Sequence, residues 1–291
     1  MRMSNGDGVA ARRVIAAARK RLALGADGFS RVGDEELQAW ELLEYAAGEE
    51  LDGDDVIDPV VHRKFDRLIE RRLTGEPVAY IRGFEEFRRL RLAVGPGAFV
   101  PRQSSEFLAE QAIRRLRTRK DPIAADLATG VGGVALAIGQ EVPSARVYGT
   151  DTSDAALRLA RANARSHRLS NVTFGRGSMF DPLPAKLRGS FDVIASHPPY
   201  IAKSEVPDLP KELLEFEPVD SLTDASDDGL GLIRLLVNGA KDWLKPGGWV
   251  CIEVGPYLAR TLRSMLVRAQ YADVRSTGGP ADQSRVLVAK R

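Results

Sequence analysis

Ile123-Ala-Ala-Asp-Leu-Ala-Thr-Gly-Val-Gly-Gly133 is the most informative segment of this 291-residue chain. Its first five residues have the apolar character of a buried strand, and the glycines that follow allow a tight turn. Residues 133–141 then carry the pattern of a helix. A strand, a glycine-rich turn and a helix in this order predict a βα unit. In such a unit the backbone of the turn can approach a ligand, with the helix N-terminus behind it.

The same alternation continues to the end of the chain. Apolar runs of strand length are separated by segments of helix length, which is typical of a doubly wound α/β sheet. The expected strands are 123–127, 146–150, 172–174, 191–195, 249–254 and 285–289, and the expected helices are 133–141, 154–166, 229–243 and 257–269.

Upstream of this region the pattern is helical. Three helices are expected over residues 9–24, 34–48 and 58–75, with the first ending near Gly25. The third opens with Asp58-Pro59, a capping residue followed by a proline in the first turn. These short helices with polar connections predict a small α-helical domain.

The pattern changes again after Gly75. Residues 78–81 and 84–94 alternate as the strands of a β-hairpin would, and a further helix is expected to start at Ser104 or Ser105. We therefore divide the chain into a helical substrate-recognition domain (1–75), a β-hairpin linker (76–100) and a ligand-binding α/β domain (101–291).

Composition narrows the class of protein. Hydrophobic residues make up 44% of the chain and charged residues 28%, which is ordinary globular usage and excludes a disordered or fibrous protein. The net charge of +2 does not indicate a dedicated DNA binder. One cysteine and three histidines leave little material for a disulfide scaffold or a metal site. The chain has neither a run of about 20 apolar residues nor a secretory signal. It is expected to be a cytoplasmic protein without a metal.

Two features of the first βα units indicate a cofactor. Gly130, Gly132 and Ala135 satisfy the relaxed dinucleotide pattern G-x-G-x-x-A. Asp151 ends the second strand 21 positions after Gly130, where an acid accepts hydrogen bonds from ribose hydroxyls. The spacing predicts a nucleoside-containing cofactor without specifying which one.

The segment His197-Pro-Pro-Tyr200 follows the fourth expected strand. A strand that runs into two prolines cannot continue, and the prolines stiffen a backbone whose carbonyls are free to accept hydrogen bonds. The carboxyl edge of such a sheet is where α/β proteins bind ligands. With an aromatic residue beside it and a cofactor turn on the neighbouring strand, we interpret this segment as functional rather than as a plain loop.

These motifs together resemble those of the HemK/PrmC protein-(glutamine-N5) methyltransferases, and the resemblance covers nearly the whole chain. It rests on an ordered set of segments. They are Gly75-Glu-Pro-Val-Ala-Tyr-Ile-Arg-Gly83, Val100-Pro-Arg-Gln-Ser-Ser-Glu106 (I-P-R-P-x-T-E in the family), Asp126-Leu-Ala-Thr-Gly-Val-Gly132 (D-L-G-T-G-T-G), Asp151, His197-Pro-Pro-Tyr200 (N-P-P-Y), Phe216-Glu-Pro218 and Asp228-Gly-Leu230.

The resemblance implies a fold, a cofactor and a substrate. The fold is a Rossmann-like, seven-stranded class I methyltransferase domain preceded by a helical bundle and a β-hairpin. The cofactor is S-adenosylmethionine, and the methyl acceptor is a glutamine amide, typically in a peptide-release factor and in a sister group in a ribosomal protein. The implied cofactor-binding residues are Asp126, Ala128, Thr129, Gly130, Gly132, Asp151, Met179 and His197. The implied catalytic residues are His197, Pro198 and Tyr200, and Pro199 joins them in binding the substrate.

Three departures from the family pattern stand out. Ala128 replaces a glycine, and Gln103 and Ser105 replace the Pro and Thr of the second motif. The largest is His197 in place of asparagine, because neutral imidazole has one acceptor nitrogen and imidazolium has none. His197 is compatible with glutamine methylation at a pH-sensitive site, with a diverged enzyme in which it is a general base for a small molecule or another nucleophile, and with a slow, degenerate site.

Other functions and partners stay open at this stage. A DNA adenine N6-methyltransferase would also use a Pro-Pro-aromatic turn, a dehydrogenase would use the glycine pattern, and a non-enzymatic scaffold would follow from decay of the site. We expect a monomer that acts on a protein, possibly a release factor, or on a small molecule. The acidic segment 205–228 is expected to be a solvated loop or a lid, and the hairpin arginines (Arg82, Arg88, Arg89 and Arg91) to be a solvated face or to meet an acidic partner.

Overall fold

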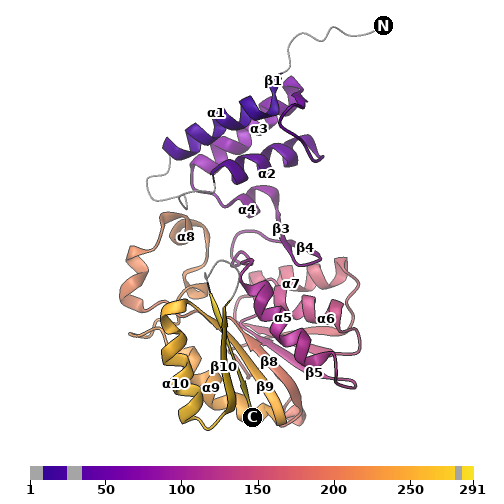
Figure 1. The fold of residues 1–291 in the computed structure, drawn as a ribbon, viewed down its shortest axis with the longest axis vertical. Coiled ribbons are helices and arrows are strands. Elements are labelled where there is room, and N and C mark those ends of the chain that lie inside the picture. Colours follow the sequence, from indigo (N-terminus) through magenta and orange to yellow (C-terminus); the bar gives the residue numbers. More distant parts are fainter. Residues whose placement is uncertain (1–8, 25–34, 279–283) are drawn as a thin grey trace. The chain divides into compact units, whose positions relative to one another are not determined.

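The computed structural model describes residues 9–24, 35–278 and 284–291 (Figure 1). The chain divides into two compact units. One comprises Met1–Phe84 and Leu209–Glu217, and the other comprises Glu85–Asp208 and Pro218–Arg291. The break between Phe84 and Glu85 falls inside the segment that the sequence assigns to the linker. The expected features at Gly25 and at residue 34 lie outside the described residues.

The first unit is a small helical bundle. Its main helices are α1 (Ala11–Leu24), α2 (Glu35–Ala47) and α3 (Pro59–Leu73), and the short strands β1 (Val9–Ala10) and β2 (Val56–Ile57) pair antiparallel beside them. The three helices expected from the sequence are therefore present. They share one apolar core, whose largest fully buried members are Leu42, Leu43, Phe65 and Ile69.

The start of α3 follows the capping chemistry that the sequence indicates. The Asp58 carboxylate accepts a hydrogen bond from the backbone N of Val60 at 2.7 Å, and Pro59 is the first helical residue. This arrangement satisfies one orphan N–H and places a proline where its missing N–H is not needed.

The prediction of a strand over residues 78–81 is wrong, because this stretch forms the short helix α4 (Val78–Arg82). Pro77 precedes the helix, and Gly83 ends it in the left-handed conformation at φ 79° with its N–H on the carbonyl of Ala79. Tyr80 and Ile81 are buried. The β-branched and aromatic residues favour a strand locally, but the flanking proline and glycine and the burial of one helical face override that preference.

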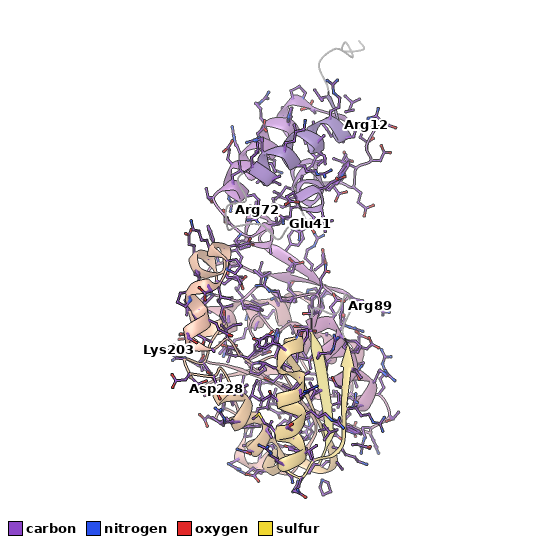
Figure 2. The ribbon with its side chains drawn as sticks, turned by 60° about the vertical axis from the view of Figure 1, so that its left-hand side comes forward. Arg12, Glu41, Arg72, Arg89, Lys203 and Asp228 are labelled. Atoms are coloured by element: carbon purple, nitrogen blue, oxygen red, sulfur yellow. The ribbon has the colours of Figure 1, made fainter. Side chains whose placement is uncertain are left out.

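The hairpin itself is present as β3 (Phe84–Phe87) and β4 (Leu90–Ala93). Its arginines are largely engaged within the chain. The Arg88 guanidinium donates to Glu141 at 2.5 Å, and Arg91 donates to Glu86 at 2.8 Å. Arg89, labelled in Figure 2, is exposed. Arg88 is thus held within the chain, whereas Arg89 and Arg91 are exposed.

The second unit contains a seven-stranded sheet in the described part of the chain, in the order β10-β11-β9-β8-β5-β6-β7. Strands β9, β8, β5, β6 and β7 run parallel to one another, and β11 is antiparallel to both of its neighbours. The strands are β5 (Ile123–Leu127), β6 (Arg146–Asp151), β7 (Val172–Arg176), β8 (Phe191–Ser196), β9 (Leu244–Val254), β10 (Ala272–Gly278) and β11 (Arg285–Lys290).

Helices cover the sheet on both faces (Figure 1). One layer consists of α5 (Ser105–Leu116), α6 (Gly133–Glu141) and α7 (Asp154–Ser166), and the other of α9 (Gly231–Trp243) and α10 (Ala259–Arg268). Between the sheet and α9–α10 lies an apolar core in which Trp243 stacks on Phe180 at 6.0 Å between ring centroids. The doubly wound α/β fold expected from the sequence is confirmed.

Strand β10 has no counterpart among the expected strands. Its residues read Ala-Asp-Val-Arg-Ser-Thr-Gly and are mostly exposed, so the apolar alternation that identifies a half-buried strand is missing. Its pairing with β11 holds it in place at the edge of the sheet.

The acidic segment 205–228 is more structured than an open loop. It includes most of the 3-10 turn η2 (Lys203–Asp208), the helix α8 (Lys211–Phe216) and the turn η3 (Val219–Ser221). Helix α8 belongs to the helical unit, where Glu212 accepts a hydrogen bond from Arg72 at 2.8 Å. Arg72 is 4% exposed and also donates to Gln38 at 2.8 Å. None of the described helices is long and apolar enough to cross a membrane.

Candidate active site

Four parallel strands end at the same edge of the sheet, and the predicted site residues gather there. Strands β5 and β6 lead into the glycine loop (128–133) and Asp151, and β8 and β9 lead into His197-Pro-Pro-Tyr200 and Glu253. The Ser196 hydroxyl donates to the carbonyl of Leu127 at 2.8 Å and ties the ends of β8 and β5 together. Because these strands are neighbours in the sheet, the glycine loop and the Pro-Pro turn lie at one edge of it and form one candidate site.

The glycine loop takes left-handed backbone conformations at three positions. Ala128, Gly130 and Gly132 have φ values of 58°, 56° and 92°. A Cβ added at Gly130 would meet nothing within 4 Å, so the backbone there faces open space. A Cβ at Gly132 would lie 3.0 Å from Phe174 and 3.1 Å from Leu136, so this glycine lets the loop pack closely on the strand and helix behind it.

The carboxylate of Asp126, in strand β5, anchors the glycine loop by hydrogen bonds. Its Oδ2 accepts hydrogen bonds from the Thr129 hydroxyl at 2.5 Å and from the backbone N of Ala135 at 3.0 Å. Burial raises the pKa of Asp126 to about 7, and the two donors oppose that shift. Asp126 therefore organises the loop and the first turn of α6.

Asp151 links the end of β6 to the glycine loop. Its Oδ2 accepts from the backbone N of Gly130 at 2.8 Å, and its Oδ1 accepts from Ser153 N at 2.9 Å. Burial raises the pKa of Asp151, while these backbone donors counteract the rise. Each oxygen retains acceptor capacity, which suits the ribose hydroxyls of a nucleoside cofactor.

Met179 lies beside this half of the site. It has a positive φ of 45°, its side chain is 4% exposed, and its carbonyl accepts from the Thr150 hydroxyl at 2.7 Å. A buried apolar side chain near the end of β6 is compatible with the adenine contact implied by the resemblance, and that contact stays a prediction.

His197 lies among aromatic and acidic side chains. Its ring meets Phe99 edge-on with 6.3 Å between centroids and is tilted by 32° against Tyr200 at 5.7 Å. Its Nδ1 is 3.1 Å from the Ser105 hydroxyl and 3.6 Å from Oε2 of Glu253. Phe99, Ser105 and Glu253 are not among the site residues predicted from the sequence. Glu253 could have been found as the one acid within the apolar run 249–254.

Tyr200 is also largely enclosed. Burial raises its pKa to about 12, and the neighbouring Tyr257 and Glu253 act in the same direction. Tyr200 therefore stays neutral at ordinary pH and offers a flat aromatic face and a hydroxyl rather than a charge.

The Pro-Pro turn is supported from behind by residues 222–231. The backbone N of Ile201 donates to the carbonyl of Leu222 at 3.0 Å, and a Cβ added at Gly229 would lie 2.2 Å from the carbonyl oxygen of Tyr200. Asp224 fixes this support, since its Oδ2 accepts from Leu232 N at 2.7 Å in the first turn of α9. The backbone N of Lys203 also donates to the carbonyl of Ser226 at 3.1 Å; Lys203 and Asp228 are labelled in Figure 2.

Two family models match this chain. A family model described as a methyltransferase domain matches residues 120–263, and one described as the PrmC N-terminal domain matches residues 15–83. The release factor glutamine methyltransferase of Xylella fastidiosa (strain 9a5c) is 38% identical over 238 residues, covering 82% of this chain and 85% of that protein. The enzyme of the same name from Geobacter sulfurreducens is 37% identical over 223 residues, covering 76% of this chain and 75% of that protein.

Solved structures agree on the fold. A methyltransferase from Pyrococcus furiosus superposes with a TM-score of 0.51 at 20% identity, covering 69% of this chain and 88% of that one. Fold and site therefore define an S-adenosylmethionine-dependent methyltransferase with the seven-stranded class I architecture, as the resemblance predicted. The open space at Gly130 and the acceptors of Asp151 fit that cofactor.

The relatives specify the family. At 36–38% identity over most of their length, several curated proteins share one name, and the chain belongs to the family of release factor glutamine methyltransferases. The small-molecule, DNA-adenine, dehydrogenase and scaffold alternatives gain no support from these relatives.

Proposed function

We propose that this chain methylates the side-chain amide nitrogen of one glutamine in a peptide-release factor. The observation that carries the proposal is the His197-Pro-Pro-Tyr200 turn beside the glycine loop, in a chain whose relatives are named for this reaction. The same proposal locates the enzyme in the cytoplasm, where release factors act, and treats it as a monomer.

The chemical difficulty of the reaction lies in the nucleophile. An amide nitrogen is a weak nucleophile because its lone pair is delocalised into the carbonyl. When bound, S-adenosylmethionine supplies an electrophilic methyl group on a positively charged sulfur. The His197 side chain and the Pro198 carbonyl would accept hydrogen bonds from the two amide N–H groups, and Tyr200 would pack on the flat amide. The rate then comes mainly from orientation and electrostatics.

The proposal also assigns the residues of the glycine loop and its neighbours to binding S-adenosylmethionine. We propose that Thr129, Gly130 and Gly132 lie under the methionine and ribose, that Asp151 accepts from the ribose hydroxyls, and that Met179 lies beside the adenine. Asp126 and Ala128 hold the loop in shape. The hydrogen bonds of Asp126 and Asp151 support this division, because they fix the loop without using all of their acceptor capacity.

The direct test is methyl transfer with purified components. Enzyme, methyl-labelled S-adenosylmethionine and purified release factors are incubated, and the modified residue is mapped by mass spectrometry. The expected result is one methyl group on one glutamine, and no label when that glutamine is replaced by asparagine, whose amide is one methylene shorter. Label on a ribosomal protein or a small molecule, with none on the release factors, would overturn the proposal.

A further inference from the structure

Glu253 is an unusual group for the end of a buried strand. It is 0% exposed, and neither of its carboxylate oxygens has a hydrogen-bond partner among the described residues. A buried polar group without a hydrogen-bond partner lowers the stability of the fold, and does so more strongly when it is charged. Such a group therefore calls for an explanation other than folding.

The group that faces Glu253 is the imidazole of His197. Oε2 of Glu253 is 3.6 Å from Nδ1, and the Ser105 hydroxyl is 3.1 Å from the same nitrogen. On the other side of the ring, Nε2 has no hydrogen-bond partner among the described residues, and the His197 side chain is 21% exposed. One nitrogen therefore points to protein acceptors and the other is available to a ligand.

Aromatic side chains also contact the His197 ring. The Tyr200 ring packs on His197 and meets Tyr257 at 6.3 Å. The Arg102 guanidinium lies 4.3 Å from the centroid of the Phe99 ring, which itself meets His197 edge-on. Glu253 is thus the acid that faces the imidazole, with its Oε2 3.6 Å from Nδ1.

We propose that Glu253 is a positioning residue that holds the His197 proton on Nδ1, so that Nε2 presents its lone pair to an N–H of the substrate amide. This inference rests on the proposed function. A carboxylate 3.6 Å from Nδ1 attracts a proton there and repels a bare lone pair. The Ser105 hydroxyl can accept from the same Nδ1–H.

In this arrangement His197 can accept a proton from the substrate, which an asparagine side chain cannot do. The nitrogen that gains a methyl group must lose one proton. In this arrangement the N–H bond of the amide breaks, an Nε2–H bond forms, and the positive charge that appears on the imidazole lies opposite the negative charge of Glu253. The replacement of the family's asparagine is then a change of acceptor supported by its neighbours, and not a decayed site.

The tautomer can be tested without any methyl transfer. Nitrogen-15 NMR of histidine-labelled, cofactor-free protein at about pH 8.5, where imidazole is ordinarily neutral, distinguishes protonated from bare ring nitrogens. We expect His197 to carry its proton on Nδ1 and E253Q to move a measurable fraction to Nε2. H197N identifies the signal, and D192N, which removes the charge of another buried carboxylate in β8, leaves the tautomer unchanged. A parent protein with the proton on Nε2 overturns the proposal, even if E253Q fails to fold.

Kinetics test the consequence for the reaction. E253Q is expected to lower kcat about tenfold in the parent and less than about twofold in H197N, with the KM for release factor unchanged in both. Equal losses in both backgrounds would indicate a merely structural role and overturn the proposal. If no variant methylates release factor, the proposed function fails while the NMR result still decides the tautomer.

Discussion

The two halves of the candidate site differ in the hydrogen bonding of their buried carboxylates. In the cofactor half (residues 126–135 and 151–153), Asp126 and Asp151 each accept two hydrogen bonds from the glycine loop and its surroundings. In the transfer half (residues 196–203, 222–231 and 253–257), Glu253 accepts none from the described residues. The carboxylates of the cofactor half are hydrogen-bonded within the folded chain, whereas the carboxylate of Glu253 in the transfer half faces Nδ1 of His197 at 3.6 Å without a hydrogen bond.

The halves also differ in what fixes their backbone. Side-chain carboxylates bond directly to the glycine loop, while the Pro-Pro turn itself is held by backbone packing against Gly229 and a hydrogen bond between Ile201 and Leu222. The carboxylate of Asp224 acts one step behind that turn, on the backbone of Ser226 and Leu232. Loss of a carboxylate should therefore weaken cofactor binding gradually, and a small steric change should disable the transfer half outright. Four predictions test this difference.

The largest effect is expected for Gly229→Ala. Gly229 has a φ of 66°, and the new Cβ would lie 2.2 Å from the carbonyl oxygen of Tyr200, so the turn must shift. We expect unfolding free energy to fall by about 3 kcal/mol or more and kcat to fall by more than about 100-fold, with cofactor affinity nearly unchanged. Gly189→Ala is the matched control, because it has a φ of 71° with nothing within 4 Å of its Cβ. Equal activity in the two variants would refute the role of this contact.

The second prediction concerns the pH dependence of stability. The pKa of Asp126 is about 7 in the folded protein, above its ordinary unfolded value of about 3.9. The contribution of this group is fully present below about pH 4 and is lost as pH rises toward 7, with a slope of up to about 1.4 kcal/mol per pH unit. Asp126→Asn should remove this component, so the difference in unfolding free energy between parent and variant changes between pH 4 and 7. Asp154→Asn, at an exposed site, should leave the slope as it is. A parallel pair of curves for parent and D126N would contradict the buried-acid interpretation.

Asp151→Asn tests the other carboxylate of the cofactor half. The amide retains one acceptor oxygen but loses the charge, so we expect S-adenosylmethionine to bind about 10–100-fold more weakly by calorimetry, in line with the loss of a charge-assisted hydrogen bond. In the parent, affinity should fall on acidification at a higher pH than for an ordinary aspartate, because burial raises this pKa. Unchanged affinity in D151N would remove Asp151 from the cofactor site.

The two halves also differ in how well the sequence alone predicts which of their residues lie close together. The glycine loop and Asp151 are neighbours through a single βα unit, so their spacing along the chain already predicts their proximity. The pairing of His197 with Glu253 depends on β8 lying beside β9, which are separated by 47 residues from the end of one to the start of the other in the sequence. Glu253 is a single charge in an apolar run, and its position alone does not say what it faces.

Secondary structure was predicted wrongly where tertiary packing or pairing at a sheet edge outweighed the local preference of the residues. Residues 78–81 favour a strand by composition, yet Pro77, Gly83 and burial of one face make them helical. Strand β10 is polar and exposed, so pairing with β11 rather than an apolar pattern determines it. Strands β5 and β8, which end at the site, were predictable because they are buried along their whole length and are mostly apolar.

The smallest effect is expected for Ala128→Gly. Ala128 has a φ of 58°, which costs a residue with a Cβ about 1–2 kcal/mol relative to glycine, and glycine loses about 0.5–1 kcal/mol through its greater freedom in the unfolded chain. The net gain in unfolding free energy should be about 0.5 kcal/mol, measured by denaturant unfolding of the cofactor-free protein.

Two matched variants make this small shift interpretable. Ala225→Gly, at φ 60° in the transfer half, should give a similar gain, because the strain depends on the backbone angle and not on which half holds it. Ala162→Gly, inside helix α7, should lose about 1 kcal/mol. A loss in A128G would mean that the hydrogen bonds of Asp126 and Asp151 hold the loop only when residue 128 is stiff, so that the cofactor half depends on backbone restraint as much as the transfer half does.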